Sequence, residues 1–164
     1  MHPDKIIVED SNSGYEFFNA IGQENNILCE SAGGKSNIFS KLQSIGQETV
    51  CVIADGAAIG PEMNRLYEIT ERKSNIVLYF PESFEWLILK SGLVTDGDIK
   101  TILQEPEEYI ESKDYFSWER YFTKLLIERT QDTYLQYQKT KLNPVYLHDK
   151  IKHTIISVMQ GIIL

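Results

Sequence analysis

The stretch Val50-Cys51-Val52-Ile53-Ala54-Asp55-Gly56 decides how the rest of the chain is interpreted. Its apolar run is typical of a buried strand, and a carboxylate follows where the chain leaves that strand. Two more stretches have the same form, namely Ile6-Ile7-Val8-Glu9-Asp10 and Val77-Leu78-Tyr79-Phe80-Pro81-Glu82-Ser83-Phe84-Glu85. In open α/β sheets, ligands bind beyond the carboxyl ends of the strands. The three stretches therefore predict a sheet with acidic side chains along one edge.

Alternating strand and helix signals surround these stretches. Apolar runs predict strands at residues 5–8, 27–29, 50–54 and 76–80, and helical spacing predicts helices at 14–21, 37–45, 61–69 and 83–90. Such alternation with short loops indicates right-handed βαβ units. The predicted fold class is therefore α/β, with a four-stranded, mostly parallel sheet between helices.

After Gly92 the pattern changes to helical signals alone, which cover residues 98–104, 116–130, 132–141 and 144–163. We therefore expect an α/β domain over residues 1–92 and a helical C-terminal extension over residues 93–164, packed on or beside that domain. The last segment, residues 155–164, is apolar almost all round, so it should be buried against the sheet or against a second chain. A homo-oligomer or a protein partner held by this segment is the corresponding expectation.

Composition is typical of a globular protein that buries a core. The chain has 164 residues, 42% of them hydrophobic, and a net charge of −8. This acidic balance argues against broad non-specific binding to nucleic acid, because phosphate contacts depend on clustered cations. Cys29 and Cys51 lie in apolar runs and are expected to be buried, reduced thiols. With neither a signal peptide nor a membrane-spanning apolar run, we expect a cytoplasmic protein without a membrane partner.

Carboxylates at three strand ends suit a hard divalent cation. Mg²⁺ and Mn²⁺ prefer oxygen ligands, and a bound cation polarises phosphate oxygens and generates a nucleophile. The candidate ligands are Glu9 or Asp10, Asp55, and Glu82 or Glu85. Each acid taken singly is better explained as a helix cap or a solvated loop residue. The coincidence of three favours a metal-dependent site, provided that the strands carrying them are neighbours.

The order of elements resembles that of a Toprim domain, the topoisomerase–primase fold shared by primases, type IA topoisomerases and nucleases of the overcoming-lysogenization-defect group. Val8-Glu9 matches the family's glutamate at the end of the first strand, and Asp55 matches the first aspartate of its Asp-x-Asp motif. Glu85, with Glu82 one helical turn away on the same helix face, matches a further glutamate of several nuclease branches. The resemblance covers about residues 4–91. It implies an Mg²⁺-dependent nuclease in which Glu9 is general base or metal ligand and Asp55 is the principal metal ligand.

Two positions depart from the family pattern. Asp10 stands where glycine is usual, and Ala57 stands where the second aspartate of Asp-x-Asp is expected. Because those aspartates hold Mg²⁺ in the family, two interpretations stay open. The chain is either a metal-dependent nuclease or phosphodiester-processing domain acting on nucleic acid, or a catalytically lapsed module with a binding or oligomerisation role. In the first case Asp10, Glu62, Glu82 or Glu85 could compensate for Ala57.

The loop Gly33-Gly34-Lys35-Ser36 allows a phosphate-binding interpretation. A strand, a glycine loop, Lys-Ser and a helix form the layout of a Walker A loop, but the full pattern needs glycine where Cys29 stands. A helix N-terminus with two glycine amides and a lysine could still hold one phosphate. We therefore expect Lys35 to contact a phosphate of the nucleic-acid backbone.

Overall fold

The computed structural model of the chain describes residues 2–9, 11–56, 63–95, 98–104, 118–159 and 162. They contain a four-stranded sheet in the order β2-β1-β3-β4, and every neighbouring pair of strands is parallel. The strands are β1 (Lys5–Val8), β2 (Leu28–Ser31), β3 (Val50–Ile53) and β4 (Ile76–Tyr79). The prediction of an α/β fold with a four-stranded parallel sheet is confirmed.

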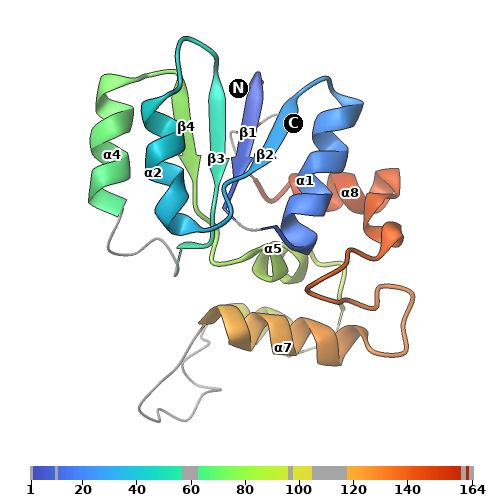
Figure 1. Cartoon of the computed structure of the whole chain (residues 1–164). Helices are drawn as coiled ribbons and strands as arrows, with labels where there is room; N and C mark the ends of the chain where they lie inside the picture. Colours follow the sequence, from blue (N-terminus) through green and yellow to red (C-terminus); the bar gives the residue numbers. More distant parts are fainter. Residues whose placement is uncertain are drawn as a thin grey trace.

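Helices cover both faces of this sheet (Figure 1). On one face lie α1 (Ser13–Glu24) and α8 (Asp149–Ile156), and on the other lie α2 (Lys35–Gln43) and α4 (Met63–Arg72). Helix α5 (Phe84–Lys90) follows β4 and lies beyond the carboxyl ends of the strands, with α7 (Trp118–Thr130) further out. Helix α6 (Ile99–Gln104) lies between α5 and α7 in the sequence, and the 3-10 helix η3 (Pro144–Leu147) precedes α8.

The two faces of the sheet belong to two apolar cores, because successive side chains of a strand point to opposite faces. Along β1, Ile7 enters the core beneath α2 and α4, whereas Ile6 and Val8 enter a larger core beneath α1 and α5. That larger core also takes Leu126 of α7 and Tyr146 of η3. The C-terminal helices therefore share a core with the α/β part, and the domain boundary near residue 92 stays a prediction.

The predicted helix over residues 132–141 is wrong. The chain leaves α7 through turns, with Asp132 in the left-handed conformation at φ 62°. The Thr130 hydroxyl accepts a hydrogen bond from the Tyr137 N–H at 3.1 Å, and the Thr133 hydroxyl accepts one from the Leu135 N–H at 3.2 Å. Such side-chain bonds to the backbone compete with helical ones. They turn Tyr137 into the larger core instead of extending a helix.

The predicted continuous helix over residues 144–163 is interrupted. Between η3 and α8, His148 has an extended backbone with φ −64° and ψ 137°. The Asn143 side chain accepts a hydrogen bond from the Val145 N–H at 3.1 Å and thereby caps η3. Two short helices with separate starts therefore replace the single long one.

The apolar residues that the structure describes at the end of the chain are buried or partly buried. Ile155, Met159 and Ile162 all lie in the larger core. An ion pair between Lys152 and Glu24 holds α8 against α1. These contacts occur within one chain, so an oligomer or partner bound through this segment stays a prediction. No helix of the described ranges has both the length and the apolar character needed to cross a membrane.

Cys29 and Cys51 are free and buried, as predicted. The register places Ile6 of β1 between them, since Ile6 pairs with Cys29 on one side and with Cys51 on the other. Two strand spacings put their Cα atoms about 9.6 Å apart, beyond the roughly 7 Å limit for a disulfide. Burial raises the pKa of each thiol to about 12, which disfavours the reactive thiolate.

Candidate functional site

Glu9 stands at the carboxyl end of β1, in the middle of the sheet. Its N–H donates a hydrogen bond to the carbonyl of Ile53 on β3 at 3.0 Å, and its carbonyl accepts one from the Gly34 N–H at 2.8 Å. The backbone of Glu9 is thus tied to β3 on one side and to the loop after β2 on the other. These two bonds fix the backbone from which the half-buried Glu9 side chain extends at the carboxyl end of β1.

Asp55 follows β3, the strand next to β1, and is also half-buried. The N–H of Gly56 donates to the carbonyl of Pro81 at 2.7 Å, so the segments after β3 and β4 stay joined. A Cβ atom at position 56 would lie 3.4 Å from the carbonyl oxygens of Phe80 and Pro81. A side chain at position 56 would thus begin in ordinary van der Waals contact with the backbone that follows β4.

Glu9 and Asp55 line the same cavity, here called the acidic cavity. Its volume is about 10 Å³, room for about one water molecule. The other lining residues are largely apolar: Val8, Gly14, Phe18, Ile53, Ala54, Pro81, Phe84 and Leu87. Mg²⁺ is commonly held by one or two carboxylates, with water and substrate phosphate oxygens as further ligands. This cavity brings together two carboxylates, and a cation bound between them stays a prediction.

The other two predicted ligands lie apart from each other. Glu82 is exposed and directly precedes Ser83, whose hydroxyl caps α5 by accepting the Trp86 N–H at 3.0 Å. Glu85 is only 3% exposed and accepts a hydrogen bond from the Tyr137 hydroxyl at 2.8 Å. The expectation that Glu82 and Glu85 share one helix face is wrong, since one meets solvent and the other meets the C-terminal segment. Neither Glu82 nor Glu85 is among the described residues that line the acidic cavity.

Within the part of the chain that the structure describes, no three His, Cys, Asp or Glu side chains are grouped to hold a metal ion. Asp10, Ala57 and Glu62 lie outside the described residues. What the described structure brings together from the predicted ligand set is the pair Glu9 and Asp55. Their roles as ligand or base stay predictions.

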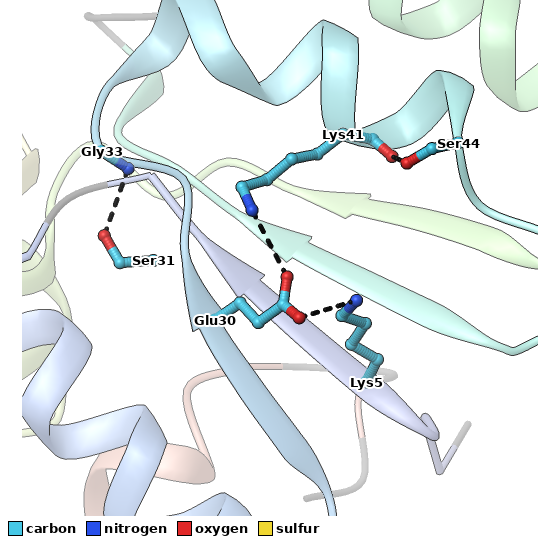
Figure 2. Close-up of polar contacts among 6 residues, drawn as sticks. All are labelled: Lys5, Glu30, Ser31, Gly33, Lys41 and Ser44. Carbon is cyan, nitrogen blue, oxygen red and sulfur yellow. Dashed lines mark hydrogen bonds and ion pairs between the residues drawn. The ribbon is translucent and has the colours of Figure 1, made fainter.

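The glycine loop before α2 uses its amides within the protein. The Gly34 N–H donates to the Glu9 carbonyl at 2.8 Å. The Gly33 N–H donates to the Ser31 hydroxyl at 3.2 Å, as Figure 2 shows. Both glycines have positive φ, 73° and 127°, which residues with a side chain rarely adopt. These two amides are therefore engaged, and the exposed side chain of Lys35 is what remains for the predicted phosphate contact.

Two polar residues of structural importance escaped the sequence analysis. Tyr137 is the buried partner of Glu85. On the edge strand β2, Glu30 pairs with Lys5 at 3.0 Å and with Lys41 of α2 at 3.4 Å (Figure 2). The hydrogen bond from Lys5 is the main cause that lowers the pKa of Glu30. Glu30 directly follows the apolar run over residues 27–29, which was the available signal for it, whereas no local signal marks Tyr137.

Comparison with known proteins identified no relative of this chain. No protein-family model matches the chain, and no curated protein or solved structure matches it either. The functional interpretation therefore depends on the residues of this chain and on the geometry of the acidic cavity.

Proposed function

We propose that the chain is a Toprim-like domain that binds Mg²⁺ or Mn²⁺ through Glu9 and Asp55 and processes phosphodiester bonds of nucleic acid. One observation carries the proposal: both carboxylates line one water-sized cavity at the carboxyl ends of two hydrogen-bonded parallel strands. That edge is where ligands bind in open α/β sheets. Asp55 is the principal ligand, and Glu9 is a second ligand or the general base.

The chemistry of such a site follows from its donors. A cation there would polarise a phosphate oxygen and lower the pKa of a bound water. The apolar wall formed by Phe18, Phe84 and Leu87 limits access of bulk water, which strengthens electrostatic interactions at the carboxylates. Lys35 begins the helix that follows the Gly34 contact to Glu9, and its exposed side chain would contact a substrate phosphate.

A second candidate is a module of the same fold that has lost catalysis and serves in binding. The contact between Glu85 and Tyr137 favours it, because it commits a carboxylate of the family pattern to the packing of α5. Ala57 in the second motif points the same way. The two candidates differ in whether metal binding leads to cleavage.

The test combines metal titration with a cleavage assay on the full chain. We expect Glu9→Gln and Asp55→Asn to weaken Mg²⁺ and Mn²⁺ binding by at least about 100-fold in isothermal titration, since loss of an outer-sphere partner alone costs about 10- to 100-fold. Nicking of supercoiled plasmid should fall in parallel. Glu71→Gln, at an exposed position of α4, is the matched control and should leave both unchanged.

Unchanged metal binding and nicking in both site variants would remove the proposed site. Metal binding that needs Glu9 and Asp55 but never leads to nicking would instead support the lapsed module. Structural integrity of each variant is checked by circular dichroism, so that misfolding is not mistaken for loss of a ligand.

A further inference from the structure

A groove runs along α7 and the segment that returns from it, here called the α7 groove. Its volume is about 500 Å³, and it is lined by Arg120, Thr123, Lys124, Ile127, Glu128 and Lys139. Three of these residues are cationic and one is acidic. The residues that line the groove thus carry a net positive charge, in a chain whose own net charge is −8.

The α7 groove combines this charge with apolar surface. Ile127 is 40% exposed although it is a large hydrophobic residue. Arginine and lysine add aliphatic stems beneath their charged ends. The pair between Lys124 and Glu128 spans 3.8 Å, with side chains 77% and 57% exposed, so it is a weak surface pair. Lys124 can therefore exchange this partner for an external anion.

The position of the α7 groove relates it to the acidic cavity. The N–H of Ser13, at the start of α1, donates a hydrogen bond to the carbonyl of Lys139 at 2.9 Å. The next residue, Gly14, lines the acidic cavity. One hydrogen-bonded layer of backbone thus separates a groove residue from a cavity residue. Figure 1 agrees, since α7 lies beyond the carboxyl ends of the strands.

We propose that the α7 groove binds a single-stranded segment of nucleic acid and directs it toward the acidic cavity. The choice of nucleic acid over an acidic peptide and the direction of the strand rest on the proposed function, whereas the charge and the apolar surface of the groove do not. Phosphates would pair with the cationic side chains, and unstacked bases would cover the apolar surface around Ile127. A duplex hides its base faces and would leave that surface uncovered. An acidic peptide matches the charge, but the neighbouring cavity suits a phosphate-bound cation, which favours nucleic acid.

The test measures binding without metal. A fluorescein-labelled single strand of about 15 deoxynucleotides is titrated with the full chain in EDTA over a series of salt concentrations, and anisotropy is recorded. Each of Lys124→Gln and Lys139→Gln should weaken binding about fivefold at 0.1 M salt. Each should also reduce the slope of log affinity against log salt by about 0.7, the value for one phosphate contact on a single strand. Lys150→Gln, at an exposed position of α8, is the control.

Equal effects of the groove and control variants, an unchanged salt slope, or absence of binding by the wild type would overturn the inference. Binding of an oligoglutamate peptide in place of the oligonucleotide would also overturn it. Binding that depends on Lys124 and Lys139 supports the inference even if Glu9→Gln leaves nicking unchanged. That combination would reject the proposed function and keep the groove. Conversely, Glu9→Gln could abolish nicking while Lys124→Gln and Lys139→Gln leave oligonucleotide binding unchanged. That result would keep the proposed function and reject the groove as the binding site.

Discussion

Glu85 illustrates what one residue's sequence context can and cannot predict. Its place after β4 follows from the apolar run and the cap that precede it, which are local features. Its partner Tyr137 is 52 residues further along the chain. No spacing rule connects such distant positions, and local spacing wrongly assigned Tyr137 to a helix. Glu9 and Asp55 were predictable together because parallel strands bring their carboxyl ends to one edge.

The contact between Glu85 and Tyr137 predicts a measurable loss of stability. Tyr137→Phe removes the donor and leaves a buried carboxyl without its hydrogen bond, so the free energy of unfolding should fall by about 1–3 kcal/mol in urea titration. Glu85→Gln keeps an acceptor oxygen and should cost less. Tyr134→Phe, at a tyrosine that is 68% exposed, should stay within about 0.5 kcal/mol of wild type. Similar losses at Tyr137 and Tyr134 would contradict this role.

At the scale of elements, apolar runs bounded by loops predicted all four strands to within two residues. The ends of the helices in the C-terminal part were harder to predict, because hydrogen bonds between side chains and backbone determine where these helices end. The hydroxyls of Thr130 and Thr133 accept hydrogen bonds from the backbone N–H groups of Tyr137 and Leu135. In a helix over residues 132–141 these N–H groups would donate to backbone carbonyls. Charge placement also joins elements in ways that hydrophobic patterning does not show. Glu30 of β2 anchors α2 over the sheet edge through Lys41.

The anchor at Glu30 predicts a pH dependence of stability. Lys5 and Lys41 hold the pKa of Glu30 below its ordinary value of 4.5. A carboxyl with a lowered pKa in the folded state stabilises the fold above pH 4.5, and this contribution is lost as the pH falls through the lowered pKa. Glu30→Gln should therefore lower the free energy of unfolding by up to about 1 kcal/mol at neutral pH. The difference from wild type should vanish in acid.

Urea titrations between neutral and acidic pH check this expectation. Glu71→Gln, at an exposed position of α4, should show no comparable pH-dependent difference from wild type. A difference at Glu30 that persists in acid would mean that packing, and not charge, anchors α2. High salt provides a second check, because it screens an exposed ion pair and should shrink the effect.

At the scale of the whole molecule, the larger core joins residues from both sides of Gly92. Phe17 of α1 and Phe84 of α5 pack with Leu126 of α7 and Tyr146 of η3 in one apolar cluster. Sequence patterning divided the chain at residue 92 because strands cease there, but patterning does not reveal which helix faces meet. A shared core makes cooperative unfolding of both parts the physical expectation.

Leu126 tests that expectation. It is fully buried, so Leu126→Ala should lower the free energy of unfolding by about 2–5 kcal/mol. Its neighbour Ile127 is 40% exposed, and Ile127→Ala should cost clearly less. Unfolding followed by circular dichroism and by tryptophan fluorescence should give coincident transitions in both variants. Two separated transitions, with only the later elements lost in Leu126→Ala, would show that the extension folds independently.

The pair of thiols on either side of Ile6 has a practical consequence for such measurements. Both sulfur atoms are enclosed on the same face of the sheet, on strands that flank the central β1. An alkylating reagent reaches them only when that face opens, and the high pKa of each buried thiol suppresses reaction before opening. The alkylation rate of the two native thiols therefore reports how often this face of the sheet opens, and no cysteine needs to be introduced for the measurement.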